Sequence, residues 1–336
     1  MVVSKEIHLV KRPEGMPVNS DFAMVEATLN APADGEVLVR NIYMSVDPAM
    51  RPAMTNGQTK LDRAMEGSAI GQVAASNHPN FPEGSYVLHR AGFREYHLSD
   101  GKDLSVIVPE GESLTTHLHV LGMTGLTAYG GMLVTGELKE NENVFVSAAA
   151  GAVGSVAVQI AKIKNCRTIG SCGSDEKVDY LTNELGLDGA FNYKTQSIAR
   201  SLHELLPEGI DVYFENVGGK VFEGVLRLLN AKARITLCGM IAQYGDTSGQ
   251  SPRDTWLAAG SAVFSARKVQ VHPLFVGDYV ASHQAAFLAL MGDYLRQEKV
   301  VYLEDFRAGL EVAPTAFGEM LRGGNFGKTL VVVKDP

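Results

Sequence analysis

A buried strand that runs through a turn of small residues into a helix constrains this chain more than any other feature. The segment reads VFVSAAAGAVGSVAVQIAK over residues 144–162. Its strand is expected to end near residue 148, and its helix is expected to start at Ser155. The turn therefore places backbone N–H groups at a helix N-terminus, where they can face a pyrophosphate. Gly151 allows close approach to that phosphate, and Gly154 allows close packing of helix on strand.

The same glycines could also serve ordinary packing between a strand and a helix. Ala149 replaces the first glycine of the common GxGxxG pattern, and a single glycine-rich turn is a weak signal. The signal is stronger here because the turn lies between a buried strand and a helix, and further strand–helix units follow. The sequence thus predicts a dinucleotide-binding turn, with a packing turn as the alternative.

The pattern of the chain changes near residue 122. Before it, short apolar runs separated by Pro/Gly turns predict an all-β unit, at 36–46, 68–76, 85–90 and 104–109. After it, strands and helices alternate, which is typical of a doubly wound parallel sheet. The expected strands are 144–148, 167–172, 189–193, 210–217 and 233–239. The expected helices are 155–164, 175–185, 196–206 and one near 219–230.

A last strand-like segment, KTLVVVK at 328–334, needs a sheet to join. One solution is that it pairs with the N-terminal β unit, which makes the α/β domain an insertion. The predicted fold class is therefore α/β, with a β-rich domain of residues 1–122 and 297–336. A Rossmann domain of residues 123–296 is inserted into it.

Composition agrees with two domains and narrows the partners. The chain has 336 residues, and single cores stop growing at about 250–300 residues. The net charge of -8 argues against nucleic-acid or polybasic membrane partners, which need clustered Lys/Arg. Three cysteines without a CxxC pair fit a reducing, cytoplasmic setting. Charged residues interrupt the N-terminal apolar run, so we expect no signal peptide.

The end of the second strand bears on the choice of nicotinamide cofactor. NAD-dependent enzymes usually place Asp or Glu there, about 20 residues after the glycines. Asp175 has that spacing, but Gly173-Ser174 already begins the turn, so we interpret Asp175 as a helix N-terminal residue that favours the helix dipole. Lys177 could meet a 2′-phosphate and Tyr193 could add a hydroxyl donor. Together they favour NADPH over NADH, although Lys177 alone would indicate a solvated surface charge.

Several segments together resemble the medium-chain dehydrogenase/reductase superfamily, namely AAAGAVGS, GSDEK, FNYK, ENVGG, CGMIAQY and GGNFGK. Within it, the chain is similar to the zinc-free branch of alkenal double-bond reductases and prostaglandin reductases. YMSVDPAMR at 43–51 resembles that branch's YxSxDPxMR signature, and ENVGGKVF is similar to its bacterial curcumin-reductase type. The likeness covers essentially the whole chain. It implies a GroES-like β domain holding both termini, an inserted Rossmann domain, a cleft between them and a homodimer.

Zinc-dependent alcohol dehydrogenases share this superfamily, but their ligand positions carry other residues here. Ser45 stands where a Cys ligand would be expected, and Met65 stands where a Gly-His-Glu turn would place its His. No cysteine lobe is visible, and a zinc site needs three or four ligands. We therefore expect no metal. Without zinc, alcohol oxidation lacks its Lewis acid, which shifts the expected reaction to hydride transfer onto an activated alkene.

The resemblance also implies a set of cofactor contacts. Lys177 and Tyr193 would meet the adenosine phosphate end, and Asn216 would approach the nicotinamide-side ribose. The other implied positions are Gly151, Ala152, Val153, Gly154, Cys238, Tyr244, Phe275 and Asn325. Alternatives stay open for three of them: Cys238 as a small buried residue, Asn325 as a turn residue, and Asn216 as a turn donor.

The expected chemistry is attack of the NADPH hydride on the β-carbon of an enone or enal. Negative charge then builds on the carbonyl oxygen, and a donor aimed at that oxygen stabilises the enolate. Tyr244 is the first candidate for this donor and Tyr43 is the second. An ordinary tyrosine pKa near 10 keeps the hydroxyl protonated. Tyr43 is equally consistent with a half-buried strand aromatic.

The implied substrate-side residues are Tyr43, Met50, Arg51 and Met123, with Arg51 equally consistent with a structural ion-pair partner. Ala49 stands where related proteins often carry Tyr, which favours a wider pocket and bulky substrates such as curcumin. Two other functions remain open: a quinone reductase on the same scaffold, and a non-catalytic NADPH-binding sensor.

Overall fold

The computed structural model describes residues 1–109 and 111–334. The chain divides into two compact units. One contains residues 1–118 and 304–336, and the other contains residues 119–303. The sequence placed the same two divisions at 122/123 and 296/297.

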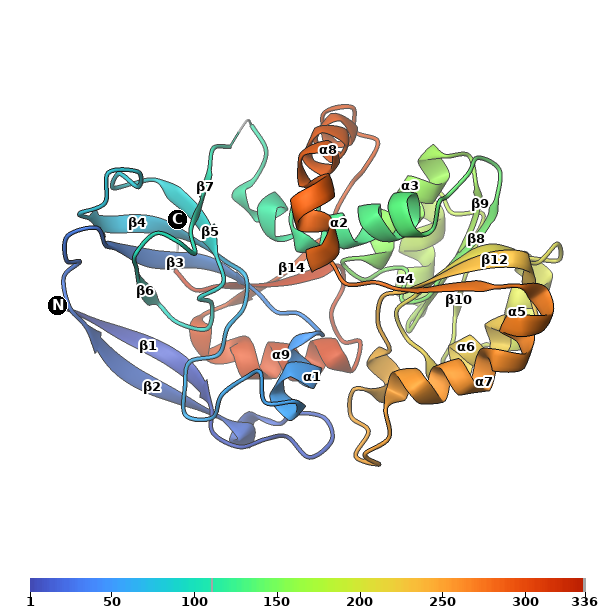
Figure 1. The fold of residues 1–336 in the computed structure, drawn as a ribbon, viewed down its shortest axis with the longest axis horizontal. Coiled ribbons are helices and arrows are strands. Elements are labelled where there is room, and N and C mark those ends of the chain that lie inside the picture. Colours follow the sequence, from blue (N-terminus) through green and yellow to red (C-terminus); the bar gives the residue numbers. More distant parts are fainter. Residues whose placement is uncertain (110, 335–336) are drawn as a thin grey trace. The chain divides into compact units, whose positions relative to one another are not determined.

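The first unit is built on a mainly antiparallel sheet with the strand order β14-β15-β3-β4-β5-β7, and β6 pairs with β3 (Figure 1). Its strands are β3 (Val37–Ser45), β4 (Ala69–Ser76), β5 (Tyr86–His89), β6 (Tyr96–Ser99), β7 (Ser105–Ile107), β14 (Glu304–Ala308) and β15 (Lys328–Val332). The C-terminal strand β15 lies antiparallel to β3, with Leu330 opposite Ser45. This pairing confirms that the α/β unit is an insertion in a β-rich unit.

Smaller elements complete the first unit. They are the antiparallel pair β1 (Val2–Leu9) and β2 (Phe22–Leu29), and the helices α1 (Met50–Thr55) and α9 (Ala313–Leu321). Alternating residues of the sheet fill its core, because successive side chains of a strand point to opposite faces. One buried cluster comprises Val37, Val39, Val73, Phe81, Val87 and Leu104.

The second unit contains a six-stranded parallel sheet with the order β10-β9-β8-β11-β12-β13 (Figure 1). The strands are β8 (Asn143–Val146), β9 (Arg167–Cys172), β10 (Gly189–Asn192), β11 (Ile210–Glu215), β12 (Leu229–Leu237) and β13 (Gln270–Pro273). The chain builds the sheet outward from β8 in one direction and then outward from β11 in the other. The strand order therefore reverses between β8 and β11, and ligands of such sheets bind beyond the carboxyl ends at this reversal.

The helices of the second unit are α2 (Met123–Tyr129), α3 (Gly154–Ile163), α4 (Asp175–Asp179), α5 (Ile198–Leu205), α6 (Gly219–Val225), α7 (Pro252–Arg267) and α8 (Gly277–Arg296). The helix predicted near 219–230 is too long, because Leu229 already pairs with Ile210 in the sheet. Across residues 1–109 and 111–334, no helix combines the length and apolarity needed to cross a membrane.

The sheet of the first unit contains a buried histidine whose pKa differs from that of a histidine in an unfolded chain. His89, at the end of β5, is 3% exposed, and its Nδ1 accepts the Ala91 N–H at 3.1 Å. Its ring stacks on His97 with 5.4 Å between centroids. Burial, and then the neighbouring His97, lower the pKa of His89 from 6.5 to about 3, while Asp103 acts in the opposite direction. His89 therefore stays neutral where a histidine in an unfolded chain becomes protonated.

We expect this difference to make folding stability depend on pH. Between pH 6.5 and about 3 the unfolded chain binds a proton that the folded protein does not, so stability present above pH 6.5 is lost as the pH falls. The slope contributed by His89 approaches about 1.4 kcal/mol per pH unit. Urea denaturation from pH 7.5 to 5 should show a shallower fall for His89→Gln than for wild type. The exposed control His203→Gln should keep the wild-type slope, and equal slopes in all three would refute the assignment.

Candidate functional site

The turn after β8 is a tight turn whose backbone passes very close to the start of α3. Ala148 adopts a φ of 50°, and its carbonyl accepts the Gly151 N–H at 3.0 Å. A β-carbon at Gly154 would lie 2.3 Å from that same carbonyl oxygen, so the start of α3 can approach the strand end only with glycine there. His119 donates from Nε2 to the Ala152 carbonyl at 3.3 Å. One hydrogen bond within the turn and one from His119 thus hold the turn in place, and α3 begins directly after it.

Polar groups gather at the end of β9, where the sequence predicts contacts with the adenosine phosphate. A β-carbon built on Gly173 would lie 3.1 Å from the Tyr193 hydroxyl and 3.4 Å from the Lys194 ammonium. Asp175, the acid at the NAD-type spacing, accepts the Asn192 side-chain amide at 2.7 Å. Lys177 lies in the first turn of α4, which Ser174 caps. Lys194 is the last residue of the motif FNYK and was not among the predicted site residues.

The residues predicted to lie near the nicotinamide follow β11 and β12. The Asn216 side-chain amide donates to the Ser147 carbonyl at 2.7 Å, so this residue bridges the ends of β11 and β8. Tyr244 follows the loop after β12, and its hydroxyl lies 3.1 Å from the place of a β-carbon on Gly239. Burial, and then nearby Cys238, raise the pKa of Tyr244 to about 12. Tyr244 is therefore a protonated hydroxyl beside the strand end that carries Asn216.

Three other predicted residues of the second unit differ in their surroundings. Cys238 follows β12, and burial, then the nearby Glu215, raise its pKa to about 12. Phe275 is 69% exposed, and Met123, at the start of α2, is 43% exposed. Their roles toward cofactor and substrate stay predictions.

In the first unit, Tyr43 lies on β3 as a half-buried strand aromatic. Its ring is 6.2 Å from that of Phe306, and it packs against a buried cluster of Ile70, Ile107, Leu118 and Leu330. This packing favours the structural alternative that the sequence left open for Tyr43.

Arg51 is a buried structural group in the first unit. It is 2% exposed, and its Nε donates to the Gly15 carbonyl at 2.9 Å. The two terminal nitrogens donate to Thr55 Oγ1 at 2.5 Å and to the Pro13 carbonyl at 3.3 Å. The guanidinium thus holds the segment 13–15 against α1, which favours its structural role over a direct contact with substrate.

Met50 and Asn325 also make local contacts in the first unit. The Met50 Cε lies 2.8 Å from the place of a β-carbon on Gly67, so this side chain packs over a glycine. The Asn325 amide donates to the Gly327 carbonyl at 2.9 Å. That bond supports the turn role left open for Asn325.

A buried ammonium occupies the surroundings of Ser45, where a zinc ligand would be expected. Lys328 is 2% exposed, and its Nζ donates to Ser45 Oγ and to the Asp47 carboxylate. Burial raises the pKa of Asp47, but the Lys328 charge and hydrogen bonds outweigh it and lower the pKa overall. Within residues 1–109 and 111–334, no three His, Cys, Asp or Glu side chains converge on a possible metal position. The donor set therefore does not fit zinc.

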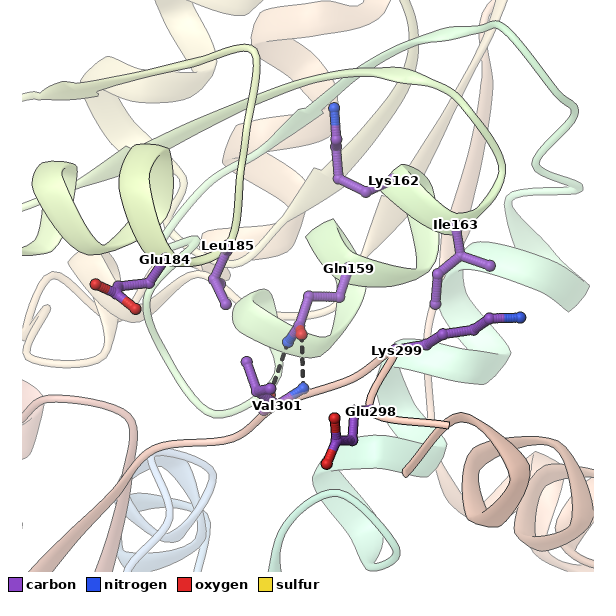
Figure 2. A pocket seen from close by; sticks show the side chains of 8 residues that line it. All are labelled: Gln159, Lys162, Ile163, Glu184, Leu185, Glu298, Lys299 and Val301. Atoms are coloured by element: carbon purple, nitrogen blue, oxygen red, sulfur yellow. Dashed lines mark hydrogen bonds between the residues drawn. The ribbon is translucent and has the colours of Figure 1, made fainter. Parts of the chain in front are cut away.

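A pocket of about 280 Å³ opens on α3 away from the turn (Figure 2). It is lined by Gln159, Lys162, Ile163, Glu184, Leu185, Glu298, Lys299 and Val301. The Gln159 side chain donates to the Val301 carbonyl at 2.9 Å and accepts the Val301 N–H at 2.8 Å (Figure 2). These paired bonds fasten the segment that leaves the second unit to α3. The pocket contains none of the predicted site residues.

Comparisons with known proteins match both units. A family model described as the N-terminal domain of oxidoreductase matches residues 5–107, and one described as zinc-binding dehydrogenase matches residues 152–276. The chain is 36% identical to the NADPH-dependent curcumin reductase of Escherichia coli, over 97% of this chain and 95% of that protein. It is 38% identical to rat (Rattus norvegicus) prostaglandin reductase 1, over 98% and 99%.

A solved structure agrees with these relatives. CurA from Vibrio vulnificus in complex with NADPH is 39% identical, with a TM-score of 0.92 over 99% of this chain and 100% of that one. A Rossmann sheet inserted in a β-rich unit defines the class of two-domain nucleotide-binding oxidoreductases. The chain belongs to the medium-chain dehydrogenase/reductase superfamily, in the branch of curcumin reductase and prostaglandin reductase 1.

The close approach at Gly154 leads to a prediction about the turn. Gly154→Ala should lower the free energy of unfolding by about 1–3 kcal/mol, because the added methyl meets backbone. It should also weaken dinucleotide binding, since the turn must move. The matched helical control is Gly292→Ala in α8, where the nearest atom is Arg296 Nη1 at 3.3 Å, a flexible side-chain end. This control should gain roughly 0.5–1 kcal/mol, as chemical denaturation would show. Equal behaviour of the two variants would contradict the close approach.

Proposed function

We propose that this protein is an NADPH-dependent reductase of the carbon–carbon double bond of α,β-unsaturated aldehydes and ketones. The observation that carries the proposal is the strand-order reversal between β8 and β11, with the turn at Gly151–Gly154 on one side and Tyr244 on the other. Relatives named curcumin reductase, prostaglandin reductase and 2-alkenal reductase match nearly the full length of the chain. Ala49 stands where related proteins often carry the larger Tyr, which favours bulky enones, including curcumin, as substrates.

The site favours NADPH over NADH for an electrostatic reason. Tyr193 and Lys194 gather beside Gly173, and Lys177 lies in the adjoining helical turn. Asp175, the acid at this edge, accepts a hydrogen bond from the Asn192 side-chain amide. The N-terminus of α3 and the turn before it would bind the pyrophosphate. We infer that these groups select the phosphorylated cofactor.

When bound, NADPH would supply the hydride to the β-carbon of the alkene, and the resulting enolate would take a proton at its α-carbon from a tyrosine hydroxyl or water. Asn216, held by Ser147, orients the nicotinamide-side ribose. Tyr244 donates a hydrogen bond to the carbonyl oxygen on which charge develops, which lowers the barrier because the donor is already in place. Its raised pKa keeps the proton on the hydroxyl throughout the neutral range.

We further infer that the protein is a homodimer and that it is located in the cytoplasm. The end strand β13 terminates the parallel sheet of the second unit, and such an edge can pair with a second chain. All three cysteines are free, which suits a reducing compartment. Sedimentation of the purified protein would test the oligomeric state.

The proposed activity is tested by following NADPH absorbance with a panel of substrates. The panel contains a short 2-alkenal, a bulky aryl enone, curcumin, a quinone and a simple ketone, with NADH in parallel. We expect oxidation of NADPH with the alkenes and not with the ketone. Reaction with the quinone alone would establish a quinone reductase instead. Binding of NADPH without any reaction would favour the non-catalytic sensor.

The donor role of Tyr244 gives a kinetic prediction. Tyr244→Phe should lower kcat for an enone by about 10²–10³, because one preorganised donor to the developing oxyanion is lost. The dissociation constant for NADPH should change much less than kcat, because phenylalanine keeps the aromatic ring that would contact the cofactor. Tyr43→Phe is the matched comparison, since Tyr43 packs in the sheet of the first unit. A large loss of kcat in Tyr43→Phe with little change in Tyr244→Phe would reverse the assignment.

Enones and enals alkylate thiolates, so the cysteines of such an enzyme face their own substrate. Burial raises the pKa of Cys166, raises that of Cys172 to about 11, and with nearby Glu215 raises that of Cys238 to about 12. Since the thiolate is the nucleophile, Cys172 and Cys238 of the folded protein without NADPH should form adducts with a short 2-alkenal at least about a hundredfold more slowly than in urea-unfolded protein. Peptide mass spectrometry measures the rate at each cysteine. Rapid stoichiometric labelling of the folded protein would contradict this protection.

A further inference from the structure

Glu215 is a fully buried carboxylate at the strand-order reversal, and the mechanism above does not use it. It is the last residue of β11 and is 0% exposed. Its Oε1 accepts the Ser147 hydroxyl at 2.8 Å and the Val217 N–H at 2.7 Å. Its Oε2 accepts Trp256 Nε1 at 3.4 Å. Burial raises the pKa of Glu215, and hydrogen bonds with Tyr213, Gly218, Val217 and Ser147 act in the opposite direction. Burying a carboxylate without partners is strongly unfavourable, so the surrounding donors define its position.

The donors to Glu215 come from three separate segments of the second unit. Ser147 follows β8, Val217 belongs to the loop after β11, and Trp256 lies on α7. The Ser147 hydroxyl that donates to Glu215 also accepts the Asn216 N–H at 2.8 Å. The Asn216 side chain in turn donates to the Ser147 carbonyl at 2.7 Å. Glu215 therefore fixes the position of Ser147. Ser147 in turn holds Asn216 through both the backbone N–H and the side-chain amide of Asn216.

The backbone of the same segment fixes the loop that leads to Tyr244. The Glu215 carbonyl accepts the N–H groups of Cys238 at 2.9 Å and Gly239 at 3.0 Å. The Asn216 carbonyl accepts the Ile241 N–H at 3.1 Å. A shift of the Glu215 side chain would thus be transmitted to both sides of the candidate nicotinamide site.

We propose that Glu215 is a positioning residue that sets the geometry of Asn216 and of the loop carrying Tyr244. It acts through Ser147, Val217 and Trp256 and touches neither cofactor nor substrate. The proposal rests on the proposed function for its kinetic readout only, because cofactor affinity can be measured whatever the reaction is.

Asp211 offers a matched control at the other end of the same strand. Its carboxylate accepts the Asn143 N–H at 2.9 Å and the Asn230 side-chain amide at 2.7 Å. It also links β11 to β8, but at the amino edge of the sheet, away from the candidate site. Loss of either carboxylate should cost stability, whereas only loss of Glu215 should change the binding of the cofactor.

The test compares Glu215→Gln with Asp211→Asn in the full chain. A glutamine can direct its oxygen to Ser147 and Val217, but its NH₂ group then faces the Trp256 N–H, donor against donor. We expect Glu215→Gln to raise the NADPH dissociation constant, measured by fluorescence titration, by roughly tenfold. It should also lower kcat for an enone. Asp211→Asn should lower Tm to a similar degree and leave both constants at the wild-type level.

Two further variants keep the proposal falsifiable. Trp256→Phe introduced into Glu215→Gln removes the opposing donor and should restore part of the NADPH affinity. Ser147→Ala breaks the link to Asn216 while retaining the carboxylate, and should raise the dissociation constant several-fold even if Glu215→Gln fails to fold. Wild-type NADPH affinity in Ser147→Ala, or equal changes in Glu215→Gln and Asp211→Asn, would overturn the proposal. If wild type binds NADPH but reduces no enone, the proposed function fails and the affinity comparison still decides the role of Glu215.

Discussion

The parallel pairing of β8 with β11 is the constraint on which the rest of the site depends. Val144, Phe145 and Val146 pair in register with Val212, Tyr213 and Phe214. All six side chains are buried. Because parallel strands end at the same edge, this register brings the glycine turn after β8 beside the ENVGG loop after β11. The two loops meet where the strand order reverses, so the sheet itself creates the binding edge.

Local patterns in the sequence predict much of this arrangement. The strand at 144–148, the helix after the small-residue turn and the strands at 167–172 and 189–193 all depend on neighbouring residues, and the structure has them within a few positions. The return of 328–334 to the N-terminal sheet is also confirmed. The helices α7 and α8 were not predicted. Only Trp256 and Gly260 of α7, and Tyr279, Phe287 and Met291 of α8, are buried, so their apolar periodicity is weak.

The residues that sequence reasoning missed take their meaning from contacts distant along the chain. Glu215 lies in the ENVGG segment, yet its partner Ser147 is 68 positions away. Lys328 meets Ser45 across 283 positions. Arg51 shows the converse case: its signature segment indicates a family, but its hydrogen bonds to Gly15 and Pro13 show a packing role. A motif fixes which residues recur together, and only the fold shows which of them face a ligand.

The surroundings of Ser45 in the first unit also depend on a charged residue that is distant along the chain. A zinc-type scaffold needs several anionic or neutral donors turned toward one point, whereas here a buried ammonium already lies between Ser45 and Asp47. An ammonium offers donors and no vacant coordination position, so Lys328 holds β15 to the end of β3 and uses Ser45 and Asp47 as its acceptors. In the second unit, burial raises the pKa of Tyr244 to about 12, so its hydroxyl stays a hydrogen-bond donor at neutral pH.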